Sequence, residues 1–174
     1  MNLKANVINV LTVLGIVLGM LAIAMNLLAG WLLLPAALIL TSALIDLYDG
    51  RLARRHNLVS TVGAWLDLTN DLLSFAIAPV VFAHTCSLTG QPAFPVVVAL
   101  FLLSALFRLR RYHLQSDSQV MQGLPTTVSG VVLTMVVVGF ALSSFKGIAA
   151  SWILYALMIL LSILMVSSFR WRKS

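Results

Sequence analysis

Apolar residues fill six stretches of the chain, each about 20 residues long, with short polar connections between them. The stretches cover approximately residues 7–28, 31–50, 63–83, 94–113, 126–145 and 149–168. A helix of about 20 residues crosses the roughly 30 Å hydrocarbon core of a bilayer, and a lipid-exposed backbone must satisfy its own hydrogen bonds. The pattern therefore predicts an all-α integral membrane protein, with six transmembrane helices in one bundle and a single domain over residues 1–174.

The composition excludes an ordinary soluble domain. Hydrophobic residues make up 61% of the chain and charged residues only 9%, and the mean hydropathy is +1.05. A net charge of +6 is typical of some nucleic-acid-binding proteins, but here the positions of the charges indicate another cause.

The basic residues gather on one side of the predicted bundle. Ten of the eleven fall at connections on that side, and only Lys146 lies on the other. The ten are Lys4, Arg51, Arg54, Arg55, Arg108, Arg110, Arg111, Arg170, Arg172 and Lys173. Cytoplasmic connections carry an excess of Lys and Arg. We therefore expect a multi-pass protein of the cell (inner) membrane with both termini in the cytoplasm, and no nucleic-acid partner.

The acidic residues are concentrated even more strongly than the basic ones. Four of the five lie in the segment DLYDGRLARRHNLVSTVGAWLDLTND, residues 46–71. The second apolar stretch is too short to cross a bilayer unless its helix continues through Asp46 and Asp49. Asp46 and Asp49 are three residues apart, and Asp67 and Asp71 are four apart, so each pair shares a helix face. Two consecutive helices thus bring four carboxylates to the cytoplasmic side.

Divalent cations explain such a cluster better than an ordinary solvated helix end does. A charged residue at membrane depth costs up to about 2.5–3.5 kcal/mol, and neighbouring carboxylates repel one another. Carboxylate oxygens suit Mg²⁺, Mn²⁺ or Ca²⁺, and a pair of such ions commonly clamps a phosphoryl centre. Small residues one turn from the acids leave room for a ligand: Gly50, Ala53 and Gly63. The segment therefore predicts a metal site for phosphoryl chemistry.

The same segment resembles the signature of the CDP-alcohol phosphotransferase family. It reads Asp46-x2-Asp49-Gly50-x2-Ala53-Arg54-x8-Gly63-x3-Asp67-x3-Asp71, which matches the family at all eight fixed positions. The resemblance extends to the six-span plan and so covers essentially the whole chain. It implies that an alcohol hydroxyl attacks a CDP-linked lipid, usually CDP-diacylglycerol, at the lipid-side phosphorus, and that CMP leaves.

The resemblance also implies roles for the matching residues. Two divalent cations, Mg²⁺ or Mn²⁺, are expected on the four motif aspartates, Asp46, Asp49, Asp67 and Asp71. The last of them, Asp71, matches the family's proposed general base. The nucleotide site is expected to be formed by Gly50, Ala53, Arg54 and Gly63. Members generally form homodimers, so a homodimer is expected here as well.

Three further segments resemble the phosphatidylserine synthases of this family. Residues 74–79, SFAIAP, are similar to their SFGVAP segment, residues 107–112 to their RLARF segment, and residues 123–125 to their GLP. This resemblance implies serine as the acceptor. Arg108 and Arg111 match the subgroup's arginines, and a guanidinium fork is suited to serine's carboxylate. Alternatively, these arginines only set the membrane topology.

Two departures from the pattern leave other acceptors open. Asn70 stands where the family usually has a small apolar residue, and Arg110 adds a charge where the serine synthases often have Ala. An extra cation also suits glycerol phosphate or inositol phosphate, and inositol or an amino alcohol are further candidates. A divalent-cation transporter is a different class of protein, and it would need polar groups through the bilayer that the outer halves of the helices lack.

Overall fold

The structure is a computed structural model that describes residues 3–29, 31–56, 61–86, 91–114, 120–143, 147–167 and 170–172. Within these residues, six long helical segments follow one another along the chain. They are α1 (Leu3–Ala29), α2 (Leu33–His56), the continuous run α3 (Thr61–Asn70), η1 (Asp71–Ile77) and α4 (Ala78–Thr85), then α5 (Phe94–Leu114), α6 (Thr126–Leu142) and α7 (Ile148–Val166). Each segment coincides with one of the six predicted apolar stretches, so the predicted helices are confirmed.

Four of these segments are long and apolar enough to cross a membrane. They are Val7–Leu28, Leu33–Leu52, Val62–Thr85 and Ile148–Val166. The other two are borderline, because α6 has only 17 residues and α5 carries three arginines in its C-terminal part. The helices therefore indicate a multi-pass membrane protein, while the count of six spans and the cytoplasmic position of both termini stay predictions.

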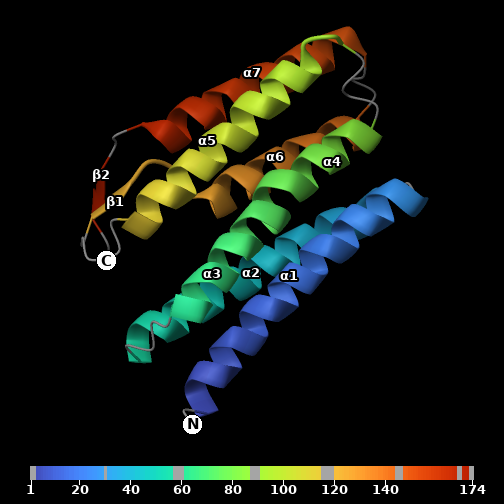
Figure 1. Cartoon of the computed structure of the whole chain (residues 1–174). Coiled ribbons are helices and arrows are strands. Elements are labelled where there is room, and N and C mark those ends of the chain that lie inside the picture. Colours follow the sequence, from blue (N-terminus) through green and yellow to red (C-terminus); the bar gives the residue numbers. More distant parts are fainter. Residues whose placement is uncertain are drawn as a thin grey trace.

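The helices run alternately up and down the bundle (Figure 1). Helix α1 packs along α2 and against α3, η1 and α4, whereas α5 packs along α7. Helix α6 lies between these groups, in contact with α2, η1, α4 and α7. The N-terminal end of α1 and the C-terminal ends of α2, α5 and α7 lie at one end of the bundle, toward the lower left of Figure 1. This arrangement agrees with the one-sided distribution of basic residues.

A two-stranded ribbon at that end was not predicted. Strand β1 (Val120–Gln122) pairs antiparallel with β2 (Arg170–Arg172), and Met121 lies opposite Trp171. The all-α prediction therefore describes the bundle but misses the ribbon. Three residues are too few for the alternating pattern by which a strand is recognised in a sequence.

We call the continuous run of α3, η1 and α4 the third helix. It widens into the π-helical segment η1, which begins at Asp71. Pro79 lacks the N–H that would bond to the Phe75 carbonyl in a regular helix, and the N–H of Ala78 bonds to Leu73 O, five residues back. A Cβ on Gly130 of α6 would lie 2.5 Å from the Phe75 carbonyl oxygen. The absence of that Cβ lets α6 approach the π-helical segment closely, and such segments are frequent at functional sites.

Helix α1 also approaches the third helix closely, at glycines four residues apart. A Cβ on Gly15 would lie 2.9 Å from Asn70 Oδ1, and a Cβ on Gly19 would collide with the Ser74 hydroxyl. Small residues at this spacing allow close helix packing in membranes. They also bring the polar side chains of the third helix, Asn70 and Ser74, against the backbone of α1.

Candidate active site

A cavity of about 450 Å³ lies between α2, the third helix and α6. We call it the acidic cavity. Its polar lining consists of Asp46, Asp67, Asp71, Arg108 and Thr127. The rest of its lining is small or apolar: Ala43, Leu47, Gly50, Pro125, Val128, Val131 and Val132. Three of the four motif aspartates, one predicted nucleotide-site glycine and one predicted acceptor arginine therefore meet in one cavity.

Asp71 is the buried acid at the start of η1. Its Oδ2 lies 3.5 Å from Arg108 Nη1, and its Oδ1 accepts a hydrogen bond from Thr127 Oγ1 at 3.2 Å. Arg108 is buried as well, and its Nη1 also donates to the Thr126 hydroxyl. The pair places a fixed cation beside the carboxylate that the motif assigns as the base.

Asp46 is held at both of its carboxylate oxygens. Asn70 Nδ2 donates to Oδ1 at 3.2 Å, and Thr127 Oγ1 donates to Oδ2 at 3.0 Å. These donors come from two different helices, the third helix and α6. The direction of the Asp46 carboxylate is therefore set by side chains on two sides.

Asp49 has a different environment from the other three acids. It is only 3% exposed and is not part of the cavity lining. Its Oδ2 accepts a hydrogen bond of 2.8 Å from Thr12 Oγ1 of α1. The three-residue spacing predicted one shared face for Asp46 and Asp49, but α1 packs along α2, so Asp49 bonds to α1 while Asp46 lines the cavity.

The cavity aspartates are suitable ligands for a divalent cation, but their side chains do not converge on one point. No three His, Cys, Asp or Glu side chains converge as a metal site in the described ranges of the chain. Thr12, Asn70, Arg108 and Thr127 instead occupy carboxylate oxygens. Three carboxylates lining one cavity are nevertheless the oxygen ligands that Mg²⁺ and Mn²⁺ prefer. The assignment of the four aspartates as metal ligands stays a prediction.

The remaining predicted site residues are placed as follows. Gly63 lies in α3, one turn before Asp67, and does not line the cavity. Ala53 and Arg54 belong to the last turns of α2, and their side chains fall outside the described part of the structure. The predicted nucleotide site is thus represented in the cavity by Gly50 alone.

Arg111 does not line the acidic cavity. Its Nη1 donates to the Val166 carbonyl and its Nη2 to the Ser167 carbonyl, both at 3.1 Å. A basic side chain that bonds to the last carbonyls of a helix stabilises its C-terminus. In this arrangement Arg111 joins α5 to the end of α7, whereas Arg108, one turn earlier, faces the acids.

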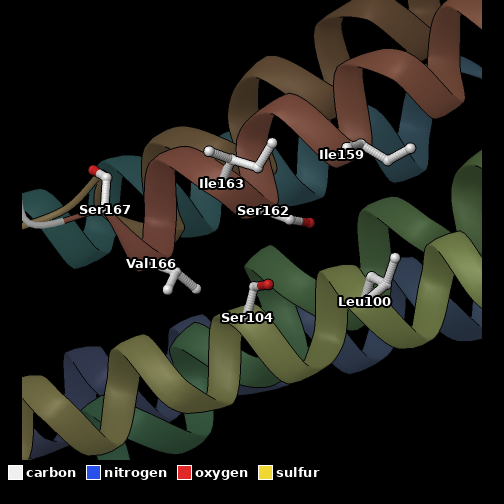
Figure 2. A pocket seen from close by; sticks show the side chains of 7 residues that line it. All are labelled: Leu100, Ser104, Ile159, Ser162, Ile163, Val166 and Ser167. Carbon is white, nitrogen blue, oxygen red and sulfur yellow. The ribbon is translucent and has the colours of Figure 1, made fainter.

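A second cavity, of about 490 Å³, lies between α5 and α7. We call it the apolar groove. Its lining residues are Leu100, Ser104, Ile159, Ser162, Ile163, Val166 and Ser167 (Figure 2). This lining has no ionisable side chain. Although the groove is slightly larger than the acidic cavity, only the acidic cavity carries groups for phosphoryl chemistry.

The comparison with protein families decides the identity of the chain. The sequence model of the CDP-alcohol phosphatidyltransferase family matches residues 5–169. The chain belongs to the CDP-alcohol phosphatidyltransferase family. This family is generally dependent on divalent metal ions, which agrees with the chemistry of the cavity aspartates.

Several curated members of the CDP-alcohol phosphatidyltransferase family are similar to this chain, each named a CDP-diacylglycerol–serine O-phosphatidyltransferase. The Bacillus subtilis protein is 31% identical over 99 residues, which are 56% of this chain and 56% of that protein. The Methanocaldococcus jannaschii protein is 30% identical over 162 residues, 93% of this chain and 71% of that protein. The Helicobacter pylori protein is 28% identical over 138 residues, 77% of this chain and 58% of that protein. The chain thus spans little more than half of the Bacillus subtilis relative.

Around the phosphatidyltransferase motif, the structure adds contacts that sequence reasoning missed. Thr12 bonds to Asp49, Asn70 and Thr127 bond to Asp46, and Thr126 bonds to Arg108. The signal for these residues was present, since a polar side chain within an apolar span is costly unless it has a partner. The sequence could not identify the partner, because each contact joins different helices.

Proposed function

We propose that this chain transfers the phosphatidyl group of CDP-diacylglycerol to the hydroxyl of serine and releases CMP, a step of phospholipid biosynthesis. The observation that carries the proposal is the meeting of Asp46, Asp67, Asp71 and Arg108 in one cavity with apolar walls. Such a cavity combines groups for phosphoryl transfer with surface for a lipid. The names of the relatives and the three segments similar to serine synthases support serine as the acceptor.

The cavity suits a donor that is part nucleotide and part lipid. Val128, Val131 and Val132 of α6 line it together with apolar residues of α2, and these walls match the lipid part of the donor. Gly50 leaves the backbone of α2 open to the nucleotide. The apolar lining also favours an enzyme over a cation transporter, which would need a polar path beyond the acids.

The four motif aspartates would hold two divalent cations, Mg²⁺ or Mn²⁺. When bound, these cations supply charge neutralisation of the diphosphate and of the departing CMP. Asp46, Asp67 and Asp71 would hold the cations from the cavity, and Asp49 from the adjacent side of α2.

Arg108 and Asp71 divide the work on the acceptor. The Arg108 guanidinium is suited to hold serine's carboxylate by charge-assisted hydrogen bonds. The serine hydroxyl then lies beside Asp71, which accepts its proton as general base. The Arg108 guanidinium would thereby orient the serine hydroxyl for attack, and orientation of two reactants supplies a large part of the barrier reduction in enzymes. Since Arg111 bonds to α7, we assign acceptor binding to Arg108.

The one-sided distribution of basic residues supports a proposal for the arrangement in the cell. We propose six spans with both termini in the cytoplasm and the acidic cavity at the cytoplasmic side of the cell membrane. We also propose that residues 1–174 form one catalytic domain and that two copies form a symmetric homodimer, as the family resemblance implies; two-fold symmetry is the commonest among homo-oligomers. Thiol-reactive or protease probes applied from either side of sealed vesicles test the topology.

The reaction is tested with purified protein in mixed micelles that contain CDP-diacylglycerol and Mn²⁺ or Mg²⁺. Serine, glycerol 3-phosphate, inositol phosphate, inositol and ethanolamine are offered in separate reactions, and CMP release is measured. We expect release that requires serine, stops with a chelator and returns when metal is restored. Release with another acceptor would retain the phosphatidyl transfer and reject serine. No release with any acceptor would reject the proposed reaction.

A further inference from the structure

Asn70 is a fully buried polar residue that lies one position before Asp71 in the sequence and contacts Asp46 in space. Its relative exposure is 0%. Its Nδ2 donates to Asp46 Oδ1 at 3.2 Å. Its Oδ1 accepts from Ser74 Oγ at 2.9 Å and lies 3.4 Å from Ser42 Oγ. The side chain thus connects α2, which carries Asp46, with the third helix.

The Asp46 carboxylate fixes the direction of the Asn70 amide, and the surrounding hydroxyls are compatible with it. Ser42 and Ser74 each have one hydroxyl hydrogen, and their acceptors are the Gly15 carbonyl and Asn70 Oδ1. The shorter contacts assign Ser74 to Asn70, and Ser42 to Gly15 at 3.2 Å. Because an ionised carboxylate only accepts and only the nitrogen of the amide donates, the nitrogen faces Asp46, and the Asn70 oxygen is left to accept from Ser74. Gly15 provides the space for this arrangement, since a Cβ there would lie 2.9 Å from Asn70 Oδ1.

Thr127 holds the other oxygen of Asp46. Its hydroxyl lies 3.0 Å from Asp46 Oδ2 and 3.2 Å from Asp71 Oδ1, and its single hydrogen serves one of them at a time. Asp71 has the Arg108 cation as a further partner. Asn70 and Thr127 are uncharged, so they direct the Asp46 carboxylate without neutralising its charge. The charge therefore stays available to a cation.

We propose that Asn70 and Thr127 are positioning residues, which fix the Asp46 carboxylate in the acidic cavity and thereby set the affinity of the cavity for a divalent cation. The proposal rests on the proposed function, in which Asp46 is a metal ligand. Hydrogen-bond partners behind a metal ligand orient it, and their loss typically lowers metal affinity or activity about 10- to 100-fold. Here the two partners come from different helices, so packing of α6 against the third helix contributes directly to the metal site.

The test measures Mn²⁺ binding to the purified protein in detergent micelles by electron paramagnetic resonance, without substrate. Asn70→Ala and the nearly isosteric Thr127→Val are each expected to weaken Mn²⁺ binding about 10- to 100-fold. Thr127→Ser keeps the hydroxyl and is expected to restore binding. In CMP-release assays the same variants should need more Mn²⁺, while the KM for CDP-diacylglycerol at saturating Mn²⁺ stays within about threefold of the original.

Two matched controls separate positioning from general loss of packing. Thr134→Val removes another buried α6 hydroxyl, which donates to Gly130 O of its own helix at 2.8 Å. Asn26→Ala removes another buried asparagine, whose Nδ2 bonds to Ala22 O at 2.9 Å. Both controls are expected to bind Mn²⁺ as the original chain does.

Four outcomes bear on these roles. Original Mn²⁺ affinity in folded Asn70→Ala and Thr127→Val would overturn the positioning roles, as would equal losses in the two controls. If Asn70→Ala does not fold, the Thr127→Val and Thr127→Ser pair gives the same decision. An original chain that binds Mn²⁺ but releases no CMP would overturn the proposed reaction alone, and the binding comparison would still decide the positioning roles.

Discussion

The acidic cavity and the apolar groove are nearly equal in volume, about 450 and 490 Å³, but they differ in every property that bears on chemistry. The acidic cavity gathers three carboxylates, a guanidinium and a threonine hydroxyl, and its polar groups bond across helices. The groove is lined by aliphatic side chains and three serines, and two of these serines bond within α7 or its C-terminal end, Ser162 to Met158 O and Ser167 to Leu164 O. Volume alone therefore does not identify the site; hydrogen bonds between helices do.

Helix α5 borders both regions, and two arginines one turn apart show the contrast. Arg108 bonds to Thr126 and pairs with Asp71 in the acidic cavity. Arg111 bonds to the carbonyls of Val166 and Ser167, whose residues line the apolar groove. The same residue type thus pairs with an acid of the cavity at one position and joins two helices at the other.

The largest effect is expected from Asp71→Asn. The amide keeps the shape of the carboxyl group but cannot accept the serine proton, and general-base catalysis typically contributes about 10²- to 10⁴-fold. We expect CMP release to fall by about that factor at saturating substrates and metal. Thermal unfolding in detergent checks that the bundle is intact. Turnover within tenfold of the original in a folded variant would reject Asp71 as the base.

A smaller effect, confined to the acceptor, is expected from Arg108→Gln. Loss of a charge-assisted hydrogen bond of about 1.5–3 kcal/mol corresponds to a rise of roughly 10- to 100-fold in the KM for serine. The KM for CDP-diacylglycerol should change little, because the residues proposed to hold the donor, Gly50 and the valines of α6, are unchanged. Steady-state CMP release at varied serine and varied donor separates the two.

Arg111→Gln is the matched control for this prediction. It should leave the KM for serine within about threefold and lower the free energy of unfolding by about 1 kcal/mol, since it removes hydrogen bonds to α7 in a partly exposed position. An equal rise in the KM for serine in both variants would show instead that both arginines bind the acceptor, as the sequence resemblance implies.

The sequence predicted the parts of this molecule that depend on periodicity. Apolar runs gave the six helical segments, because a membrane-spanning helix must be long and apolar. The spacing of Asp67 and Asp71 placed both on one face of the third helix, and both line the cavity. Gly50, one turn after Asp46, lines it as well.

Features that depend on which helices are neighbours were beyond the sequence. Helical spacing allowed Asp46 and Asp49 to share a site, yet the packing of α1 on α2 gives Asp49 a partner in Thr12. The hydrogen bonds of Arg111 depend on where α7 ends. The hydrogen bond from Thr127 to Asp46 depends on the close approach of α6 at Gly130. Asn70 departs from the motif that the sequence resembles, but its bond to Asp46 follows only from the fold.

The smallest effect is expected in the apolar groove, from Ser162→Ala. The Ser162 side chain faces the space between α5 and α7 (Figure 2), yet its hydroxyl donates to Met158 O of its own helix at 2.8 Å. A hydroxyl satisfied within its helix adds little to recognition, so CMP release should stay within about twofold and the free energy of unfolding within about 0.5 kcal/mol. If instead kcat/KM for CDP-diacylglycerol fell tenfold with the KM for serine unchanged, the groove would belong to the lipid-binding surface. The contrast between the two regions would then separate donor from acceptor, rather than function from packing.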